Sequence, residues 1–261
     1  MLRPRIIPCL LVHKKGLVKT VNFKNPKYIG DPINAVRIFN EKQIDELMVL
    51  DIDATTQNHE PNYGLIEKIA SECRVPFCYG GGIKTAEQAQ KIFSLGVEKI
   101  ALSSSAIENP KLVTEIAERV GVQSVVIILD VKKGVLNRYE VYTRNGKNAT
   151  GKTPFELAVF FEKIGVGEIV INNIDNDGLM KGYDMNLIEK VRKEITLPLT
   201  ALGGAGSFND ISDLIKKFGI IGASAGSLFV FKGIYKAVLI NYPSPEVKES
   251  FFKKNLPFFF I

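Results

Sequence analysis

The sequence predicts a closed barrel of eight parallel β-strands that alternate with helices, the (β/α)8 class. Eight short apolar, β-branched runs recur along the 261 residues, and longer amphipathic segments separate them. Eight strands close such a barrel, which disfavours the alternative of a doubly wound open sheet. Three strand ends of the first half recur in order in the second half, so we expect a duplicated half-barrel. No linker-like composition divides the chain, and we expect one barrel domain over residues 1–261.

The strands and helices are predicted from local patterns. The expected strands cover residues 5–12, 47–52, 75–80, 98–103, 124–130, 168–174, 197–202 and 219–224. Asp31 followed by Pro32 places a cap residue before a proline in the first helical turn. The other expected helix boundaries are Asn109 with Pro110, Thr85 with Gln88 and Thr153 with Glu156 at N-termini, and Gly96, Gly121 and Gly165 at C-termini.

Composition excludes several classes of protein. The apolar fraction of 46% and the charged fraction of 24% are ordinary for a globular domain, and no apolar run is long enough to span a membrane. We interpret the basic, apolar start as the first strand rather than a signal peptide. Cys9, Cys73 and Cys78 lack the spacing of disulfides or zinc sites, so we expect a cytoplasmic protein without a metal. We expect the aromatic tail, residues 251–261, to pack against the body.

The net charge of +6 bears on the ligand. The lysines are scattered over helical segments instead of forming a basic tract with interleaved aromatics, which disfavours nucleic-acid binding. We interpret the positive charge as one that attracts a phosphorylated small molecule.

Two glycine clusters follow the third and the seventh strand, in "FCYGGGIKTAEQ" and "TALGGAGSFND". Glycine lets the backbone approach a ligand closely, and the N–H groups at a helix start favour a phosphate. Each cluster alone is as well explained by a tight turn. Small residues after the following strands, Ser103 with Ser104 and Gly226 with Ser227, favour a ligand with two phosphates at the carboxyl ends of the strands.

Several motifs together carry a family resemblance: "RIIPCL", "GDP", "LDI", "PFCYGGGI", "ENP", "GEI", "IDNDG", "GYD" and "GGAGS". Spread in this order over nearly the whole chain, they resemble the HisF-like cyclase subunit of imidazole glycerol phosphate synthase, a lyase of histidine biosynthesis. The resemblance implies a TIM barrel that needs no cofactor. It also implies that ammonia arrives from a separate, HisH-like glutaminase subunit through the barrel interior, and that two aspartates at the mouth act as acid and base.

The resemblance assigns roles to residues of this chain. The second catalytic aspartate falls on Asp130, but the first falls on Leu11; the catalytic lysine falls on Lys19 and a further acid on Asp177. The phosphate contacts fall on Gly82, Ser103, Ser104, Gly178, Gly204, Gly226 and Ser227. The charged ring at the ammonia entrance falls on Arg5, Glu46, Lys99 and Glu168. Ser103 replaces the family's Asn, and Leu202 its Ser.

Leu11 cannot transfer a proton. Loss of one acid–base group typically costs ~10²–10⁴ in rate, so the sequence predicts a poor cyclase. His13, two residues on, lies on the same side of an extended strand, but we interpret it as a rim residue. Paralogues with "LLVH" at this strand, which are associated with sugar amidation, resemble the chain more closely there.

Three hypotheses follow. The first is a non-cyclising ammonia conduit that works beside a glutaminase and a sugar amidotransferase in surface-polysaccharide biosynthesis. The second is a genuine cyclase subunit. The third, a phosphosugar isomerase of the related barrel family, is disfavoured because that family also places an aspartate at the end of its first strand. A conduit needs an apolar interior, for which the strands offer Val49, Ile100, Leu102, Val126, Ile128 and Val170.

Overall fold

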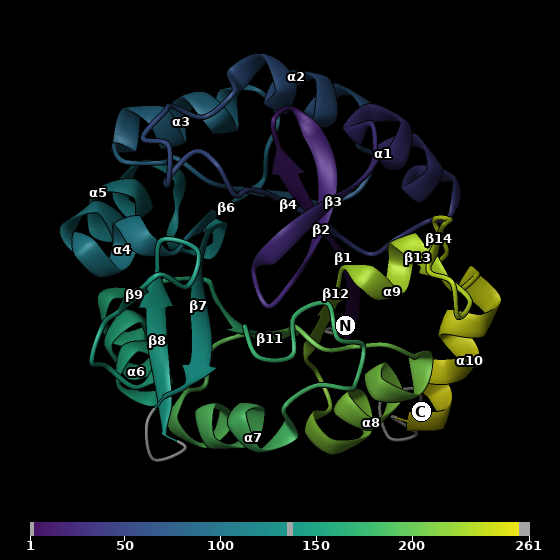
Figure 1. Cartoon of the computed structure of the whole chain (residues 1–261). Coiled ribbons are helices and arrows are strands. Elements are labelled where there is room, and N and C mark those ends of the chain that lie inside the picture. The colour runs from purple at the N-terminus through teal and green to yellow at the C-terminus, as the bar shows by residue number, and fades with distance from the viewer. Residues whose placement is uncertain (1–2, 135–137, 256–261) are drawn as a thin grey trace.

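A computed structural model describes residues 3–134 and 138–255, and it shows a closed barrel ringed by helices (Figure 1). The barrel strands are β1 (Arg5–His13), β4 (Leu47–Asp51), β5 (Phe77–Gly80), β6 (Lys99–Leu102), β7 (Val125–Lys133), β10 (Glu168–Asn173), β11 (Leu199–Leu202) and β12 (Gly222–Ala225). Each pairs in parallel with its neighbours, and the pairs β1–β12 and β7–β10 complete the ring. The predicted fold class is confirmed, and each expected run overlaps a barrel strand.

The helices lie outside the strands. They are α1 (Pro32–Glu41), α2 (Tyr63–Glu72), α3 (Ala86–Ser94), α4 (Ser104–Glu108), α5 (Lys111–Val120), η1 (Val122–Ser124), α6 (Pro154–Ile164), α7 (Met185–Glu194), α8 (Phe208–Phe218), α9 (Ser227–Val230) and α10 (Pro245–Asn255). Asp31 caps α1 by accepting from the backbone N–H of Asn34 at 2.9 Å. One boundary was wrong: Asn109 follows α4, and α5 begins after Pro110 without a side-chain cap.

Three excursions from the barrel, all within residues 3–134 and 138–255, were not predicted. The hairpin of β2 (Gly16–Val21) and β3 (Lys24–Gly30) crosses the mouth in Figure 1. Two shorter pairs are β8 (Tyr139–Thr143) with β9 (Asn148–Ala149) and β13 (Phe231–Lys232) with β14 (Ala237–Val238). β2 and β8 run antiparallel to β1 and β7, so Leu11 and Asp130 occupy corresponding positions, each opposite an excursion strand.

Apolar side chains form two separate layers. The larger layer lies between strands and helices, and the smaller fills the barrel interior with Ile7, Cys9, Met48, Cys78, Ala101, Val126, Ile128, Val170 and Leu202. Of the conduit residues expected from the sequence, Val126, Ile128 and Val170 face inward. Val49, Ile100 and Leu102 pack in the layer toward the helices, because alternate residues of a strand point to opposite faces.

The end of the chain joins the bottom of the barrel through α10. Lys248 donates to the carboxylate of Asp45 at 2.6 Å, and the ring of Phe252 is fully buried. The expected packing of the tail is therefore found for Phe251 and Phe252, while residues 256–261 lie outside the described residues. Within the described ranges, no helix is long and apolar enough to cross a membrane.

Candidate functional site

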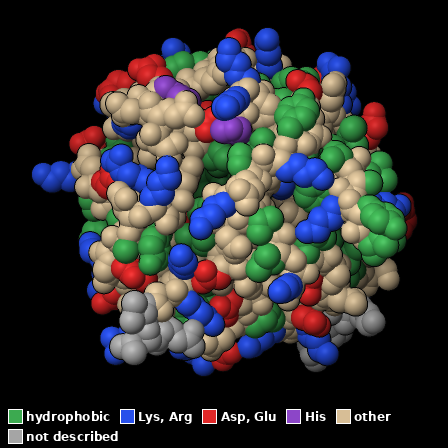
Figure 2. Space-filling model, in the orientation of Figure 1, with side chains coloured by type: hydrophobic (Ala, Val, Ile, Leu, Met, Phe, Trp, Pro, Cys, Tyr) green, Lys and Arg blue, Asp and Glu red, His purple; other side chains and the backbone are tan. Residues whose placement is uncertain are grey.

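The barrel mouth holds a cavity of about 120 Å³ beside the β2–β3 hairpin. Strand ends from β1, β4, β5, β6, β7 and β10 contribute to its wall, as the C-terminal face of such a barrel requires. Figure 2 shows this face hollowed near its centre, with lysine and arginine side chains around the hollow. The lining residues are Leu11, Thr20, Phe23, Leu50, Asp51, Ile52, Thr55, Gly80, Gly81, Gly82, Ile83, Ala101, Leu102, Ser103, Ser104, Ser105, Ile128, Asp130, Asn145 and Asn172.

The first glycine turn forms one wall of this cavity. Gly81 and Gly82 have φ values of +122° and +74°. A Cβ on Gly81 would come within 2.5 Å of the Asp51 carbonyl oxygen, so the turn requires glycine for packing as well as for φ. Ser103 and Ser104, at the start of α4, line the same cavity. The structure thus brings together the three residues expected at the first phosphate.

The second glycine turn lines a smaller cavity of about 20 Å³. Gly203 and Gly204 have φ values of +90° and +114°. The cavity is lined by Gly178, Met180, Leu202, Gly203, Gly204, Ala205, Ala225, Gly226 and Ser227, which include the four residues expected at the second phosphate.

Asp130 stands at the end of β7 in the larger cavity. Its carboxylate accepts from the amide of Asn172 at 2.8 Å and from the hydroxyl of Ser103 at 3.2 Å. Burial raises the pKa of Asp130 to about 7, against the opposing effect of these two hydrogen bonds. A carboxyl with such a pKa exchanges protons near neutral pH, which suits an acid–base group.

Leu11 places an apolar side chain in the same cavity. It pairs in register with Leu50 of β4, and both side chains line the wall. His13 does not replace the missing acid there, because its Nδ1 lies 2.8 Å from the carboxylate of Asp53 and its side chain is not part of the cavity lining. This geometry agrees with the interpretation of His13 as a rim residue.

A second carboxylate of the cavity, Asp51, was not singled out from the sequence as a site residue. Its Oδ1 accepts from the backbone N–H groups of Asp53 and Ala54 at 2.9 and 3.1 Å. Burial raises the pKa of Asp51. The sequence signal was an acid at the end of a buried strand. Asp51 and Asp130 are therefore two carboxylates that line one cavity.

Lys19 and Asp177 both lie outside the lining of the larger cavity. The buried ammonium of Lys19 donates to the Cys9 carbonyl at 2.5 Å and lies beside Gly226, where a Cβ would come within 2.3 Å of Nζ. Burial lowers the pKa of Lys19. Asp177 accepts from the Thr20 hydroxyl at 2.7 Å and thereby fastens the hairpin to the loop after β10.

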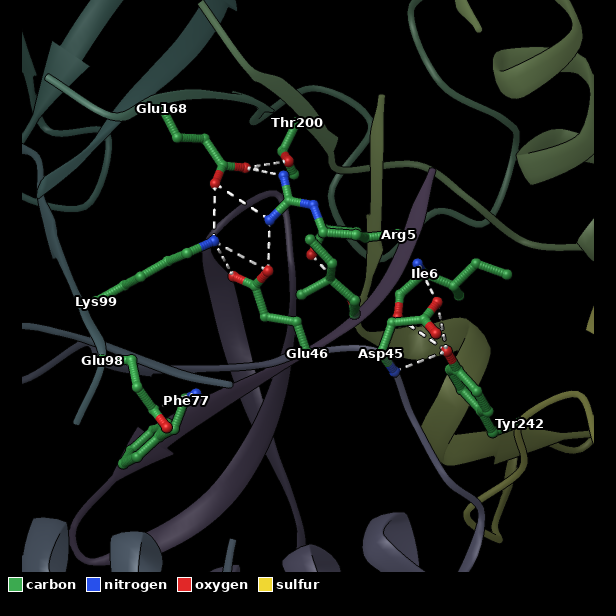
Figure 3. Close-up of polar contacts among 12 residues, drawn as sticks. Arg5, Ile6, Asp45, Glu46, Phe77, Glu98, Lys99, Glu168, Thr200 and Tyr242 are labelled. Carbon is green, nitrogen blue, oxygen red and sulfur yellow. Dashed lines mark hydrogen bonds and ion pairs between the residues drawn. The ribbon is translucent and has the colours of Figure 1, made fainter. Parts of the chain in front are cut away.

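At the opposite end of the barrel, Arg5, Glu46, Lys99 and Glu168 form an ion-paired ring (Figure 3). Lys99 donates to Glu46 at 2.9 Å and to Glu168 at 3.1 Å, while Arg5 donates to Glu46 and, at 2.7 Å, to Glu168. Thr200 adds a hydroxyl bond of 2.5 Å to Glu168. Burial opposes ionisation of Glu168, but Arg5 and Lys99 lower its pKa. The predicted convergence of the four charges is present.

Comparison with known proteins finds a family model and relatives that cover most of the chain. A family model described as "Histidine biosynthesis protein" matches residues 5–236. A protein of Vibrio vulnificus that carries the provisional name imidazole glycerol phosphate synthase subunit hisF3 is 57% identical over 250 residues, 95% of this chain and 96% of its own. The imidazole glycerol phosphate synthase subunit HisF of Alkaliphilus metalliredigens is 39% identical over 237 residues, 90% of this chain and 93% of its own. That of Streptococcus sanguinis is 36% identical over 229 residues, 88% and 91%.

Proposed function

We propose that the chain acts as the cyclase-type subunit of an imidazole glycerol phosphate synthase. The basis for this proposal is that the chain belongs to the histidine biosynthesis protein family and is a HisF-like barrel. In this proposal a glutaminase partner delivers ammonia at the ion-paired ring, and ring closure takes place at the mouth. The relatives' names favour this cyclase reading over the sugar-amidation reading.

The single observation that carries the proposal is that the two ends of one barrel hold the two features that an ammonia-dependent cyclase needs. An ion-paired ring closes one end, an apolar layer fills the interior, and an acid–base cavity flanked by two glycine turns occupies the other end. A ring alone is explained by the need to pair buried charges. Its position at the end of the barrel opposite Asp130 supports a role in ammonia transfer, because an apolar interior favours passage of neutral ammonia over ammonium.

The ligand of this proposal carries two phosphates. The turn at Gly82 lines one cavity of the mouth together with Ser104, and the turn at Gly204 lines a second cavity together with Ser227. Backbone N–H groups at such turns and serine hydroxyls are suitable donors for phosphate oxygens. Asp130 lines the first of these cavities, so its carboxylate would lie beside a bisphosphate that reached from one cavity to the other. The phosphoribulosyl substrate of histidine synthesis has this chemistry.

Two carboxylates still serve proton transfer despite Leu11. Ring closure removes and delivers protons at separate positions of the substrate. We assign one position to Asp130 and the other to Asp51, which stands on β4 next to the register partner of Leu11. Because Asp51 lies on β4 and not at the end of β1, we expect slower turnover than in a cyclase with an acid on β1.

Leu11 is also the observation that favours a second function. A mouth without the β1 carboxylate suits a barrel that passes ammonia to a sugar amidotransferase in surface-polysaccharide biosynthesis and closes no ring. Both functions use the same ring and the same glutaminase partner. They differ in whether the mouth performs chemistry. The three free thiols of the described chain fit a cytoplasmic site of action for either one.

The test is turnover of the phosphoribulosyl substrate by the purified chain, first with an ammonium salt and then with glutamine and the glutaminase subunit. We expect cyclised product from both nitrogen sources, and loss of product in Asp130→Asn. Absence of product with ammonium, together with ammonia transfer to an acetamido sugar when the amidotransferase is added, would reject the cyclase in favour of the conduit.

A further inference from the structure

We propose that Asn172 is a positioning residue that directs the acid–base proton of Asp130 onto the carboxylate oxygen Oδ2, beside the hydroxyl of Ser103. This inference rests on the proposed function, since it concerns a group that moves protons during ring closure. The family resemblance gave no role to Asn172. It placed Ser103 where the family has an asparagine, and in this chain the amide beside Asp130 comes from β10.

Two donors hold the Asp130 carboxylate, one at each oxygen. Nδ2 of Asn172 donates to Oδ1 at 2.8 Å, and the hydroxyl of Ser103 donates to Oδ2 at 3.2 Å. Asn172 is 6% exposed and pairs in register with Asp130, so the pairing of β10 with β7 fixes the first contact. Ser103 is half-buried and lines the same cavity. The two oxygens of one carboxylate therefore have partners of different kinds.

The two partners respond differently when Asp130 takes up a proton. An amide NH₂ group only donates hydrogen bonds, whereas a hydroxyl can rotate and either donate or accept. A proton on Oδ1 would face an N–H group that cannot accept it. A proton on Oδ2 can be donated to the lone pair of Ser103, while Oδ1 goes on accepting from Asn172. The hydrogen bonds thus favour Oδ2 as the oxygen that binds and releases the proton.

The orientation of the Asn172 amide follows from the charge of Asp130. If the amide were turned over, its carbonyl oxygen would face an oxygen of the ionised carboxylate, and the two would repel each other. In the orientation found, Oδ1 of Asn172 is buried without a hydrogen-bond partner among the described residues. An unsatisfied buried acceptor costs free energy, so a purely structural role would be served as well by an apolar side chain. The contact with Asp130 is what the amide adds.

Charges around Asp130 act on the carboxyl as a whole. Burial and Asp177 raise its pKa, and the hydrogen bonds from Asn172 and Ser103 lower it. Each hydrogen bond acts on one oxygen, so the choice between the oxygens falls to these two residues. The titratable groups on the elements around Asp130 include Cys9 on β1, Lys19 on β2, Asp51 on β4, Tyr142 on β8 and Asp177 in the loop after β10.

The proposal predicts that the two partners of Asp130 are not equivalent. Asn172 favours the ionised carboxyl, because a carboxylate oxygen is the better acceptor. Asn172→Leu keeps the size of the side chain, removes the unsatisfied acceptor and should raise the pKa of Asp130 by roughly one unit, a tenfold change in proton affinity. Ser103 serves both protonation states, so its loss in Ser103→Ala should move the pKa of Asp130 less.

The kinetic test measures the pH dependence of the ammonium-driven reaction. The inflection of kcat near pH 7 should move up by roughly one pH unit in Asn172→Leu, and the KM for the phosphorylated substrate should stay the same. Asn186→Leu makes the same chemical change at an exposed position of α7 and should leave the whole profile unchanged. A changed KM with an unmoved inflection would overturn the proposal, since it would show that Asn172 acts on substrate binding and not through Asp130.

A second measurement does not require turnover. Nuclear magnetic resonance of the ¹³C-labelled chain follows the Asp130 carboxyl carbon against pH, and Asp130→Asn identifies its signal by loss. The midpoint should lie at about pH 7 in wild type, highest in Asn172→Leu and between these in Ser103→Ala. If this order is found in a chain that closes no ring, the positioning role stands and the cyclase function fails. If ring closure proceeds while Asn172→Leu leaves the midpoint unmoved, the function stands and the positioning role is refuted.

Discussion

Replacing Asp130 by Asn should stabilise the protein at neutral and alkaline pH. The carboxyl has its pKa raised from 3.8 to about 7 by burial, so the folded state holds its proton more tightly than the unfolded state does. The folded state binds more protons between these two values, and stability therefore falls as pH rises from 4 to 7 and levels off above 7. An amide at this position does not ionise, so this loss disappears.

The size of the effect follows from the shift. About three pKa units at ~1.4 kcal/mol each give an upper limit of roughly 4 kcal/mol in the free energy of unfolding at pH 8. The cavity opens to water, which screens the charge, and we expect about half of this limit. The substitution costs little in hydrogen bonding, because the side-chain carbonyl of the introduced amide can still accept from Asn172.

The assay is urea denaturation of wild type and Asp130→Asn at pH 4, 6 and 8. The variant should equal wild type near pH 4 and exceed it by roughly 2 kcal/mol at pH 8. The comparison cancels the contributions of other titrating groups. A difference that stays constant from pH 4 to pH 8 would refute the assignment of a buried, half-protonated Asp130.

The remaining predictions concern the mouth and the ring. Leu11→Asp should raise ammonium-dependent cyclisation by ~10² or more by restoring an acid–base group, and an unchanged kcat would count against this. In the protein that keeps Leu11, Asp51→Asn should lower the cyclisation rate by a similar factor. Full activity of this variant would show that Asp51 takes no part in the mechanism. Lys99→Ala should lower the free energy of unfolding, measured with urea, by roughly 3 kcal/mol, because the two buried carboxylates of Glu46 and Glu168 then keep only one cation. It should also reduce glutamine-driven turnover more than ammonium-driven turnover. Equal loss of both would contradict a conduit. Gly204→Ala should weaken inorganic phosphate binding in a calorimetric titration, because its Cβ would lie 2.1 Å from a backbone oxygen and displace the turn; unaltered affinity would exclude this turn as a phosphate site.

Some features of this protein were determined by the sequence alone. The eight apolar runs fixed the barrel, because alternation of short strands with amphipathic helices permits few other arrangements. Charges that precede or begin parallel strands, such as Lys99 and Glu168, must meet at the N-terminal face. Glycines that follow the strands, such as Gly82 and Gly204, must meet at the mouth. These placements follow from the direction of the strands alone, because all strands of a (β/α)8 barrel run parallel.

Tertiary structure decided the rest. Both faces of a barrel strand are apolar, so the sequence could not tell that Val170 faces inward while Ile100 packs under the helices. Asp177 fastens a hairpin that begins more than a hundred residues earlier, and the Asn172 side chain meets Asp130 only because β10 and β7 pair in one register. Such contacts depend on strand stagger and on the path of loops, which set distances between residues that no local pattern connects.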